Sequence, residues 1–368
     1  MRAVNNGSRA GDAEVGAKTD GEPMAGAREP AAPAGVPPMR VTPFYRSLAK
    51  TEDPLLDPIA AQFVPQEREK VVLPCESDDP LDDRRYQVLP RVIHHYRDRI
   101  LVLATDECAV FCRHCFRRHF TAAIAADAGS SAANRHASHY SGAISNEEIA
   151  AAAAYLAEHT EVSEAIISGG DPLMLAPPRL EHLLAALRRA RSDLVLRVST
   201  RIPVVAPDRI TKRIVGAISR ARPAWLVVHV NHPRELTSEF RRAIDQFVDS
   251  GVPVVSQSVL LRGVNDSADT LEELFRGLVA CRVKPYYLFH GDLAAGTSHF
   301  RTSIERGLEL MRRLRTTLSG RAAPTYAVDL PDGAGKAVLT ESTVSRRDEA
   351  SYQVTRADGQ ESVFPREG

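Results

Sequence analysis

Three cysteines stand close together in a chain of 368 residues that holds only five. Cys108, Cys112 and Cys115 have the spacing C-x3-C-x2-C, which places three thiolates in one short loop. Such a loop can ligate three irons of a [4Fe–4S] cluster and leave the fourth iron open. The amino and carboxylate groups of S-adenosylmethionine (SAM) can chelate that iron, and electron transfer then cleaves a C–S bond to give a 5′-deoxyadenosyl radical. The triplet therefore predicts a cluster that generates a radical.

A structural zinc site is the main alternative for the triplet, because zinc is also held by thiolates. Zinc normally takes four ligands, and His114 is the nearest candidate for the fourth. The cysteines could also be unrelated to one another. Their compact spacing directly after the first predicted strand favours the cluster. Cys75 and Cys281 lie far from the triplet in the sequence, and we predict that they only pack against their neighbours.

From Ile100 onward, short apolar runs alternate with longer amphipathic stretches. Strands are expected at 100–105, 164–168, 194–200, 225–230, 253–260 and 285–291. Helices are expected at 145–159, 179–190, 208–221, 238–250, 269–280 and 303–315. The first of these helices begins with Ser145 and Glu148, which have the spacing of a capping box. Six strand–helix repeats predict an α/β fold, a partial (β/α)6 barrel that is similar to a TIM barrel but incomplete.

The composition divides the chain into four parts. Residues 1–40 are rich in Ala, Gly and Pro, so we expect a disordered tail. Residues 41–95 are expected to form an N-terminal cap with one or two short helices, and 96–320 the partial barrel. Residues 321–368 are then a short C-terminal extension. An Ala- and Ser-rich insertion at 121–145 predicts a flexible loop beside the triplet.

The charge balance narrows the choice of partners. Lys and Arg total 47, as do Asp and Glu, so the formal net charge is zero. A general nucleic-acid or membrane-surface binder would need a basic surplus, so neither is expected. The N-terminus has no apolar segment typical of a secretory signal, and no run of about 18 apolar residues predicts a membrane span. Few cysteines and no signal indicate a cytoplasmic protein.

Polar residues follow the predicted strands at one end. In barrels of this kind, catalytic groups gather at the C-terminal ends of the strands. The residues at that end are the triplet, SGGD at 168–171, Arg201, His229, Asn231, Gln257 and Asp292. We therefore expect a single site built from several strands.

With these motifs in place, the sequence resembles the lysine 2,3-aminomutase family of radical SAM enzymes, from about Thr42 to Leu339. The resemblance rests on motifs that occur in the same order. They are CRHCFRRHF at the triplet, SGGDPL (168–173), STRIPVV (199–205), HVNHPRE (229–235), QSVLLRGVND (257–266), DLAAGTSHFRT (292–302) and LSGRAAPTYAVDLPDGAGK (318–336). The resemblance implies an isomerase that moves the α-amino group of a free amino acid to C3.

The resemblance implies pyridoxal 5′-phosphate (PLP) as a cofactor besides SAM and the cluster. The PLP lysine of the family follows an Asp and a Pro in a glycine-rich stretch, which matches Lys336 in the segment 329–336. A lysine amine can hold PLP covalently until the amino acid substrate displaces it. Flanking glycines would let this segment move. Without the resemblance, such a lysine would more simply be a solvated loop residue.

Three residues are implied to bind the substrate. Arg117 matches the family arginine that pairs with the substrate carboxylate, a contact that suits a planar guanidinium. Asp292 and Asp329 match two aspartates that bind the distal ammonium of lysine. The resemblance thus implies conversion of free L-lysine to β-lysine. Arginine stays open as a substrate, since two carboxylates could also hold a guanidinium. Helix capping or loop hydrogen bonding is the alternative role for the two aspartates.

Further residues are implied to contact the two small cofactors. On the PLP phosphate side the matching residues are Tyr96, Arg99 and Gln257, and His229 matches another cofactor-binding position of the pocket. Beside the SAM amino group they are Ser168, Gly169, Gly170 and Asp171. His95 stands where an arginine is found in the lysine enzymes, and it can still donate a hydrogen bond. Taken singly, each of these positions would more simply be structural.

The sequence departs from the family at several points. Some relatives bind a structural zinc, but Ser267 replaces one ligand and no cysteine follows Cys281, so we expect no such zinc. A homo-oligomer stays open, and the radical chemistry requires a reducing electron donor. Phe289 replaces a family tyrosine. A branch that acts on a lysine of elongation factor P shares the triplet but lacks the aspartate pair and the D-x-P-x-G-x-G-K form, which favours the free amino acid enzymes.

Overall fold

The computed structural model describes residues 36–118, 120–121, 142–341, 344–348, 351–355 and 359–365. The predicted tail lies outside the described residues up to residue 35. Residues 122–141 of the predicted flexible loop also lie outside them.

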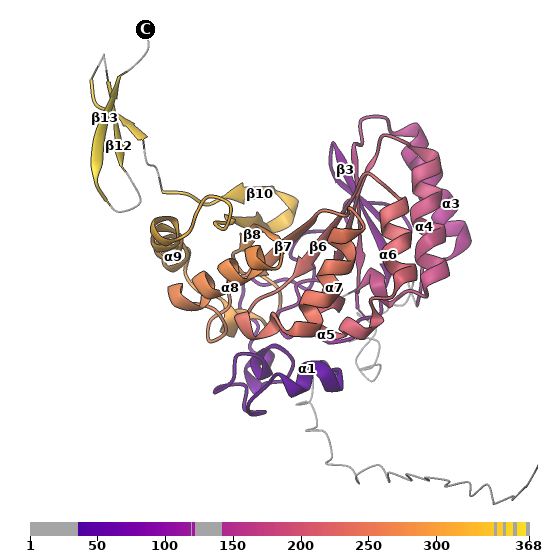
Figure 1. Cartoon of the computed structure of the whole chain (residues 1–368), viewed down its shortest axis with the longest axis horizontal. Helices are drawn as coiled ribbons and strands as arrows, with labels where there is room; N and C mark the ends of the chain where they lie inside the picture. The colour runs from indigo at the N-terminus through magenta and orange to yellow at the C-terminus, as the bar shows by residue number, and fades with distance from the viewer. Residues whose placement is uncertain are drawn as a thin grey trace, which may run out of the picture. The chain divides into compact units, whose positions relative to one another are not determined.

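Seven parallel strands form the middle of a ten-stranded sheet in the described part of the chain (Figure 1). They are β3 (Arg99–Thr105), β4 (Glu164–Gly169), β5 (Val195–Thr200), β6 (Ala224–His229), β7 (Val254–Val259), β8 (Lys284–Phe289) and β9 (Thr325–Leu330). Antiparallel strands extend both edges: β1 (Gln87–Leu89) and β2 (Val92–Tyr96) at one, β10 (Gly335–Val338) at the other. The strands follow the chain order, and the described edge strands β1 and β10 do not pair. The sheet is therefore an open, partial barrel, as predicted.

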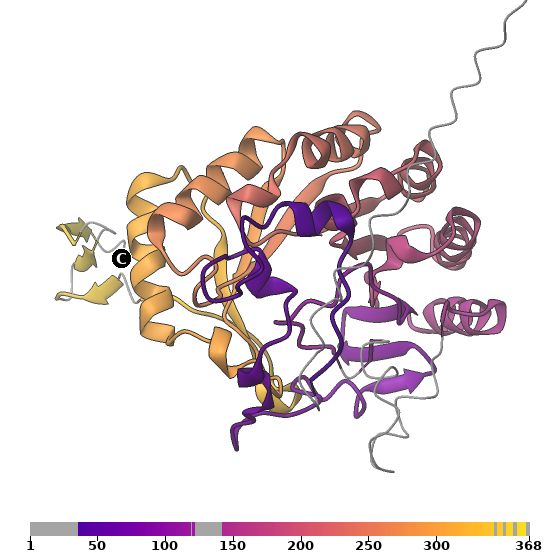
Figure 2. The same ribbon diagram turned by 90° about the horizontal axis from the view of Figure 1, so that it is seen from below.

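Six longer helices connect the parallel strands and cover the outside of the sheet. They are α3 (Asn146–Glu158), α4 (Pro177–Ala190), α6 (Lys212–Arg220), α7 (Ser238–Asp249), α8 (Ala268–Ala280) and α9 (Ile304–Thr317). Figure 2 shows them in an arc, and Figures 1 and 2 together show the indigo N-terminal segment lying across the lower end of that arc. The shorter helices are α1 (Pro43–Ser47), η1 (Ala60–Gln62), η2 (Glu67–Lys70), η4 (Pro172–Met174), α5 (Ile202–Val205), η5 (Pro207–Arg209), η6 (Pro233–Glu235), η7 (Ser298–Phe300) and η8 (Pro331–Gly333).

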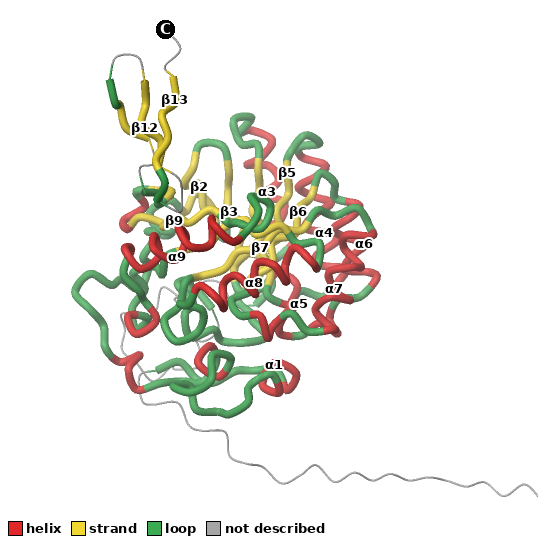
Figure 3. The backbone as a smooth tube through the Cα atoms, turned by 60° about the vertical axis from the view of Figure 1, so that its left-hand side comes forward, coloured by secondary structure: helices red, strands yellow, loops and turns green. Residues whose placement is uncertain are grey.

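A second sheet lies near the C-terminus. It consists of the antiparallel strands β11 (Val344–Arg346), β12 (Ser351–Thr355) and β13 (Glu361–Pro365), which pair only with one another in the described residues (Figure 3). The predicted C-terminal extension thus contributes β9 and β10 to the main sheet and β11 to β13 to this small one.

Apolar side chains at helical spacing fix the helices on the sheet. In α4, Leu180, Leu183, Leu184 and Leu187 lie on one face and are buried. Burying each such side chain stabilises the fold by about 1.5–3 kcal/mol. The same packing recurs along the other helices, which holds the strands in register and their C-terminal ends together.

The predicted strands and helices are all present, with small shifts at their ends. The capping box of α3 is confirmed, since the Ser145 and Glu148 side chains each accept from the other's backbone N–H. Strand β9 was missed, because its run TYAVDL is short and ends in the polar Asp329 and the exposed Leu330. The strands β1 and β2 were also missed, inside a segment predicted to be a helical cap.

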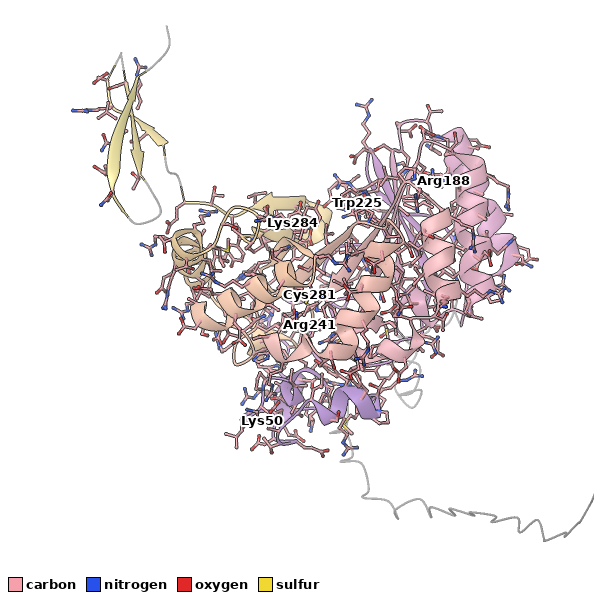
Figure 4. All side chains as sticks on the ribbon, viewed as in Figure 1. Lys50, Arg188, Trp225, Arg241, Cys281 and Lys284 are labelled. Atoms are coloured by element: carbon pink, nitrogen blue, oxygen red, sulfur yellow. The ribbon has the colours of Figure 1, made fainter. Side chains whose placement is uncertain are left out.

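The two cysteines outside the triplet differ in their surroundings. Cys281 follows α8 and is 4% exposed, so its predicted packing role is confirmed (Figure 4). Cys75 is exposed, so the packing prediction was wrong for it, because its segment lies on the surface of the cap. Among the helices of the described ranges, none has the length and apolar character needed to cross a bilayer.

Candidate functional site

The predicted site residues line one cavity of about 580 Å³. It receives side chains from the loop after β3, from the ends of several parallel strands and from the β9–β10 hairpin. The lining includes Tyr96, Arg99, Cys108, Cys112, Cys115, Arg117, Ser168, Gly169, Gly170, Asp171, His229, Gln257, Asp292, Asp329 and Lys336. Residues that are up to 240 positions apart in the chain are therefore neighbours around one space.

The cysteine loop (residues 108–118) begins directly after β3. Burial raises the pKa of Cys108 well above its usual value and that of Cys115 to about 11, and the neighbouring thiols add to both shifts. The three sulfurs therefore lie near enough to repel one another when ionised. In the described residues, however, no three His, Cys, Asp or Glu side chains close around a single metal ion. A cubane cluster puts each thiolate on a different iron, so sulfurs spaced around a volume fit it.

A buried carboxylate from the N-terminal cap holds the cysteine loop. Glu69 accepts from Nε of Arg113 at 2.9 Å and from its Nη2 at 2.5 Å. Its second oxygen also lies 3.4 Å from Arg118. Glu69 and Arg113 are almost fully buried, and a charge in that environment needs such a partner. The cap therefore fixes the backbone on both sides of Cys115.

The SGGD loop lies against the start of the cysteine loop. The N–H of Gly170 donates to the carbonyl of Thr105 at 2.6 Å, and that of Asp171 to Glu107 at 2.8 Å. A Cβ on Gly170 would clash with the Glu107 carbonyl, and Gly169 has a φ of +114°. Only glycine permits this approach at both positions.

Asp171 lines the cavity, but donors from the neighbouring backbone and strand already surround its carboxylate. Burial raises its pKa to about 6, while hydrogen bonds from the N–H of Arg201 and the hydroxyl of Thr200, each 2.7 Å long, act in the opposite direction. A third bond comes from the Leu173 N–H at 3.0 Å. Asp171 therefore ties the end of β4 to the end of β5.

Arg117 is paired within the chain. Its Nε donates to Oδ2 of Asp83 at 3.0 Å, and the two side chains are 11% and 12% exposed. Asp83 comes from the cap and also lines the cavity. Asp83 was not predicted as a site residue, because nothing in its local sequence pattern indicates a partner 34 positions away.

Lys336 stands opposite Asp329 in the β9–β10 hairpin. Its Nζ donates to Oδ1 of Asp329 at 2.6 Å and lies 4.0 Å from the ring centroid of Phe289. Burial lowers the pKa of Lys336, and Asp329 partly offsets this. The amine is thus held in the cavity by one carboxylate and one aromatic face.

Asp292 is the site's unpartnered acid. Its Oδ1 is shielded from water and has no hydrogen-bond donor among the described residues. Burial raises the pKa of Asp292 to about 7, and the negative charge of Asp329 adds to the shift. The positive charges of Lys336 and Arg117 act against it. A buried carboxyl of this kind has an unmet demand for a donor or a cation.

The two edges of the open sheet meet through side chains beside Lys336. Nε2 of His95 hydrogen-bonds the carbonyl of Gly333 at 2.5 Å, and the ring of Tyr86 packs against the same glycine. His95 is thus occupied by the lysine segment, a role that the sequence did not indicate. The Arg99 guanidinium stacks over the Tyr96 ring at 4.6 Å, which places both at the same edge.

Two stacked histidines form another wall of the cavity. Nε2 of His229 lies 3.2 Å from Nε2 of His114 and 3.0 Å from the amide nitrogen of Asn231. Burial lowers the pKa of His229 to about 3, with a further contribution from Arg201. Gln257 is next to His229 in the sheet, as their Cα positions pair between β6 and β7. This wall is therefore polar but uncharged.

Comparison with known proteins identifies the class of enzyme to which this fold and cysteine loop belong. A sequence model of the Radical SAM superfamily matches residues 102–275, which span the sheet from β3 to α8. Among solved structures, a radical SAM methyltransferase from Sphaerobacter thermophilus is 18% identical, with a TM-score of 0.47, over 65% of this chain and 68% of that one. The family match over residues 102–275 indicates that this chain is a radical SAM enzyme, a class that implies SAM and a [4Fe–4S] cluster.

Curated relatives narrow the class further. The L-lysine 2,3-aminomutase of Acetoanaerobium sticklandii is 38% identical over 81% of this chain and 68% of its own length. A putative L-lysine 2,3-aminomutase of Aquifex aeolicus is 40% identical over 85% of this chain and 80% of its own. The glutamate 2,3-aminomutase of Clostridioides difficile is 35% identical over 81% of this chain and 67% of its own length. The chain belongs to the lysine 2,3-aminomutase family, and its activity is that of a radical SAM aminomutase, an isomerase.

The close approach at Gly170 can be tested by substitution. In Gly170→Ala the new methyl group meets the Glu107 carbonyl next to Cys108, and relieving such a clash costs about 1–3 kcal/mol. We expect less bound iron after anaerobic reconstitution and weaker SAM binding, measured by iron analysis and equilibrium dialysis. Gly320→Ala is the control, since a Cβ there meets nothing within 4 Å. Normal iron and SAM binding in Gly170→Ala would contradict the tight contact.

Proposed function

We propose that this chain moves the α-amino group of free L-lysine to C3, which gives β-lysine, with PLP held by Lys336. The observation that carries the proposal is Asp292, a shielded carboxyl with one oxygen that no donor of the described residues reaches, beside the second carboxylate Asp329. A substrate ammonium would supply the missing cation. Relatives named as L-lysine 2,3-aminomutases support the same substrate.

The charges of the cavity match the two ends of lysine. Arg117 offers a guanidinium for the α-carboxylate, and Asp292 and Asp329 offer two carboxylates for the distal ammonium. Glutamate, the substrate in the name of another relative, would instead place a further carboxylate beside those two. A third negative charge next to Asp292 and Asp329 is strongly unfavourable in a buried site, so lysine fits this cavity better than glutamate does.

The residues around Lys336 fit PLP. The lysine amine lies inside the cavity with a lowered pKa, as an amine that must act as a nucleophile requires. Arg99, Tyr96 and Gln257 line the same cavity and can donate to a phosphate. When bound there, PLP supplies a conjugated π-system that can carry an unpaired electron during the amine migration.

Two internal ion pairs must open for the substrate to bind. Arg117 is held by Asp83, and Lys336 is held by Asp329. If Lys336 held a cofactor through its nitrogen, it would be a weaker hydrogen-bond donor to Asp329, and that carboxylate could accept from a substrate cation. Arg117 can exchange Asp83 for the substrate carboxylate without leaving the cavity wall. These two internal ion pairs thus neutralise both ends of the site in the absence of substrate.

The proposal is tested by offering candidate substrates separately. The cluster is reconstituted without oxygen, and PLP, SAM and a one-electron reductant are added with lysine, arginine, glutamate or ornithine. We expect a β-amino acid from lysine at the highest rate. A β-amino product from arginine alone would overturn the lysine assignment. Cleavage of SAM with no β-amino product from any of the four would overturn the aminomutase assignment.

The pKa of Asp292 predicts how lysine affinity depends on pH. Since its pKa is raised to about 7, the carboxyl holds a proton below that pH, and a bound cation must displace it. Affinity should therefore rise with pH and level off above about 7, with about a tenfold loss at pH 6. Titration calorimetry of the loaded enzyme in two buffers would report the released proton. In Asp292→Asn the affinity should be lower and this pH dependence absent.

The PLP assignment makes a separate prediction for Lys336. Borohydride reduction of the PLP-loaded enzyme should fix the cofactor's mass on the peptide that contains Lys336, as read by mass spectrometry. Lys336→Arg should lose this labelled peptide while retaining the cluster. Lys284→Arg is the matched control, because Lys284 is not among the residues that line the cavity and donates to the carbonyls of Gly320 and Ala323. Labelling of Lys284 instead of Lys336 would show the assignment to be wrong.

A further inference from the structure

Arg201 is a buried cation whose position the aminomutase reaction does not by itself explain. It follows β5 at the C-terminal end of the sheet and is 7% exposed. Its backbone N–H donates to Asp171, which fixes the start of its side chain. The guanidinium then extends toward the cysteine loop.

The two ends of the guanidinium have different partners. Nη1 donates to Sγ of Cys112 at 2.8 Å. Nη2 lies within 2.9 Å of three acceptor atoms, which are the hydroxyl oxygen of Tyr45, Oε1 of Gln62 and Oε1 of Glu235. A planar guanidinium can make both sets of bonds at once, and a lysine ammonium could not span them.

The acceptors of Nη2 are themselves fixed. Glu235 is fully buried and accepts from the N–H of Asn231 at 2.6 Å and from the N–H of His232 at 3.0 Å. The Tyr45 hydroxyl donates to Glu235 at 2.6 Å, and the ring is also buried. Because Tyr45 and Gln62 come from the N-terminal cap, the cap and the sheet together hold Arg201 against Cys112.

We propose that Arg201 sets the reduction potential of the cluster by donating a charged hydrogen bond to the Cys112 sulfur, and that Tyr45, Gln62 and Glu235 act as positioning residues for it. Reduction adds one electron, from an external one-electron donor, and so adds one negative charge to the cluster and its thiolates. A nearby cation stabilises the more negative state more strongly, which raises the potential. Hydrogen bonds to the sulfurs are among the factors that set the potentials of such clusters.

This inference rests on the cluster being held by the cysteine triplet, but not on PLP or on lysine as substrate. Its test is a redox titration of the reconstituted full-length enzyme, followed by electron paramagnetic resonance of the reduced cluster. In Arg201→Gln the ratio of reduced to oxidised cluster at a fixed potential should fall by about tenfold, since a charged hydrogen bond is lost. For a one-electron couple this is a shift of about 59 mV to lower potential.

Tyr45→Phe gives a milder variant for the same measurement. It removes one hydroxyl that holds Arg201 and should lower the potential in the same direction by less. Tyr155→Phe is the matched control, because its hydroxyl bonds His94 at 2.7 Å and does not line the cavity. Its potential should equal that of the unsubstituted enzyme.

The outcomes separate the inference from a purely structural role. An unchanged potential in Arg201→Gln with a normal iron content would overturn it, as would equal shifts in Tyr45→Phe and Tyr155→Phe. If Arg201→Gln retains no cluster, the redox titration of Tyr45→Phe is the deciding measurement. An unchanged cluster potential in that variant overturns the inference. Absence of any cluster from the unsubstituted enzyme would instead overturn the function proposed for the triplet.

Discussion

The guanidinium of Arg201 joins three parts of the molecule that are far apart in the sequence. It bonds the sulfur of Cys112 on one side and the cap residues Tyr45 and Gln62 on the other. Glu235, which follows β6, balances the charge of Arg201. The cap supplies the other two acceptors of the buried Nη2, so loss of the cap would remove both of these hydrogen bonds. The partial barrel is open, and this constraint explains how a short N-terminal segment is held in place across it.

The rest of the cavity follows the same rule of paired charges. Arg117 is neutralised by Asp83 and Lys336 by Asp329, while Asp292 is only partly ionised near neutral pH because its pKa is raised to about 7. In each case a substrate or cofactor can take the place of one internal partner with a group of the same charge sign. The site is therefore stable without its ligands and already has complementary charge for them. Its specificity then depends on which end of the substrate each pair accepts.

Sequence patterns predicted most of the fold, and the family resemblance indicated most of the residues named around the cavity, but neither showed how these residues pair. Strand and helix signals are local, so the runs from 100–105 to 285–291 were readily found. The short strand β9 was missed because Asp329 interrupts its apolar pattern. The bonds of Arg201 to Cys112 and of His95 to Gly333 join residues 89 and 238 positions apart. Only the curvature of the sheet brings such residues together, and no local pattern records it.

The central claim is that one cavity produces a radical and moves the α-amine of lysine to the neighbouring carbon. The most direct measurement uses L-lysine with ¹⁵N at the α-amine, incubated with the reduced enzyme, SAM and PLP and followed by NMR. The account predicts that the label becomes bonded to C3 of the product. A label that stays on C2, or that appears as free ammonia, would contradict it.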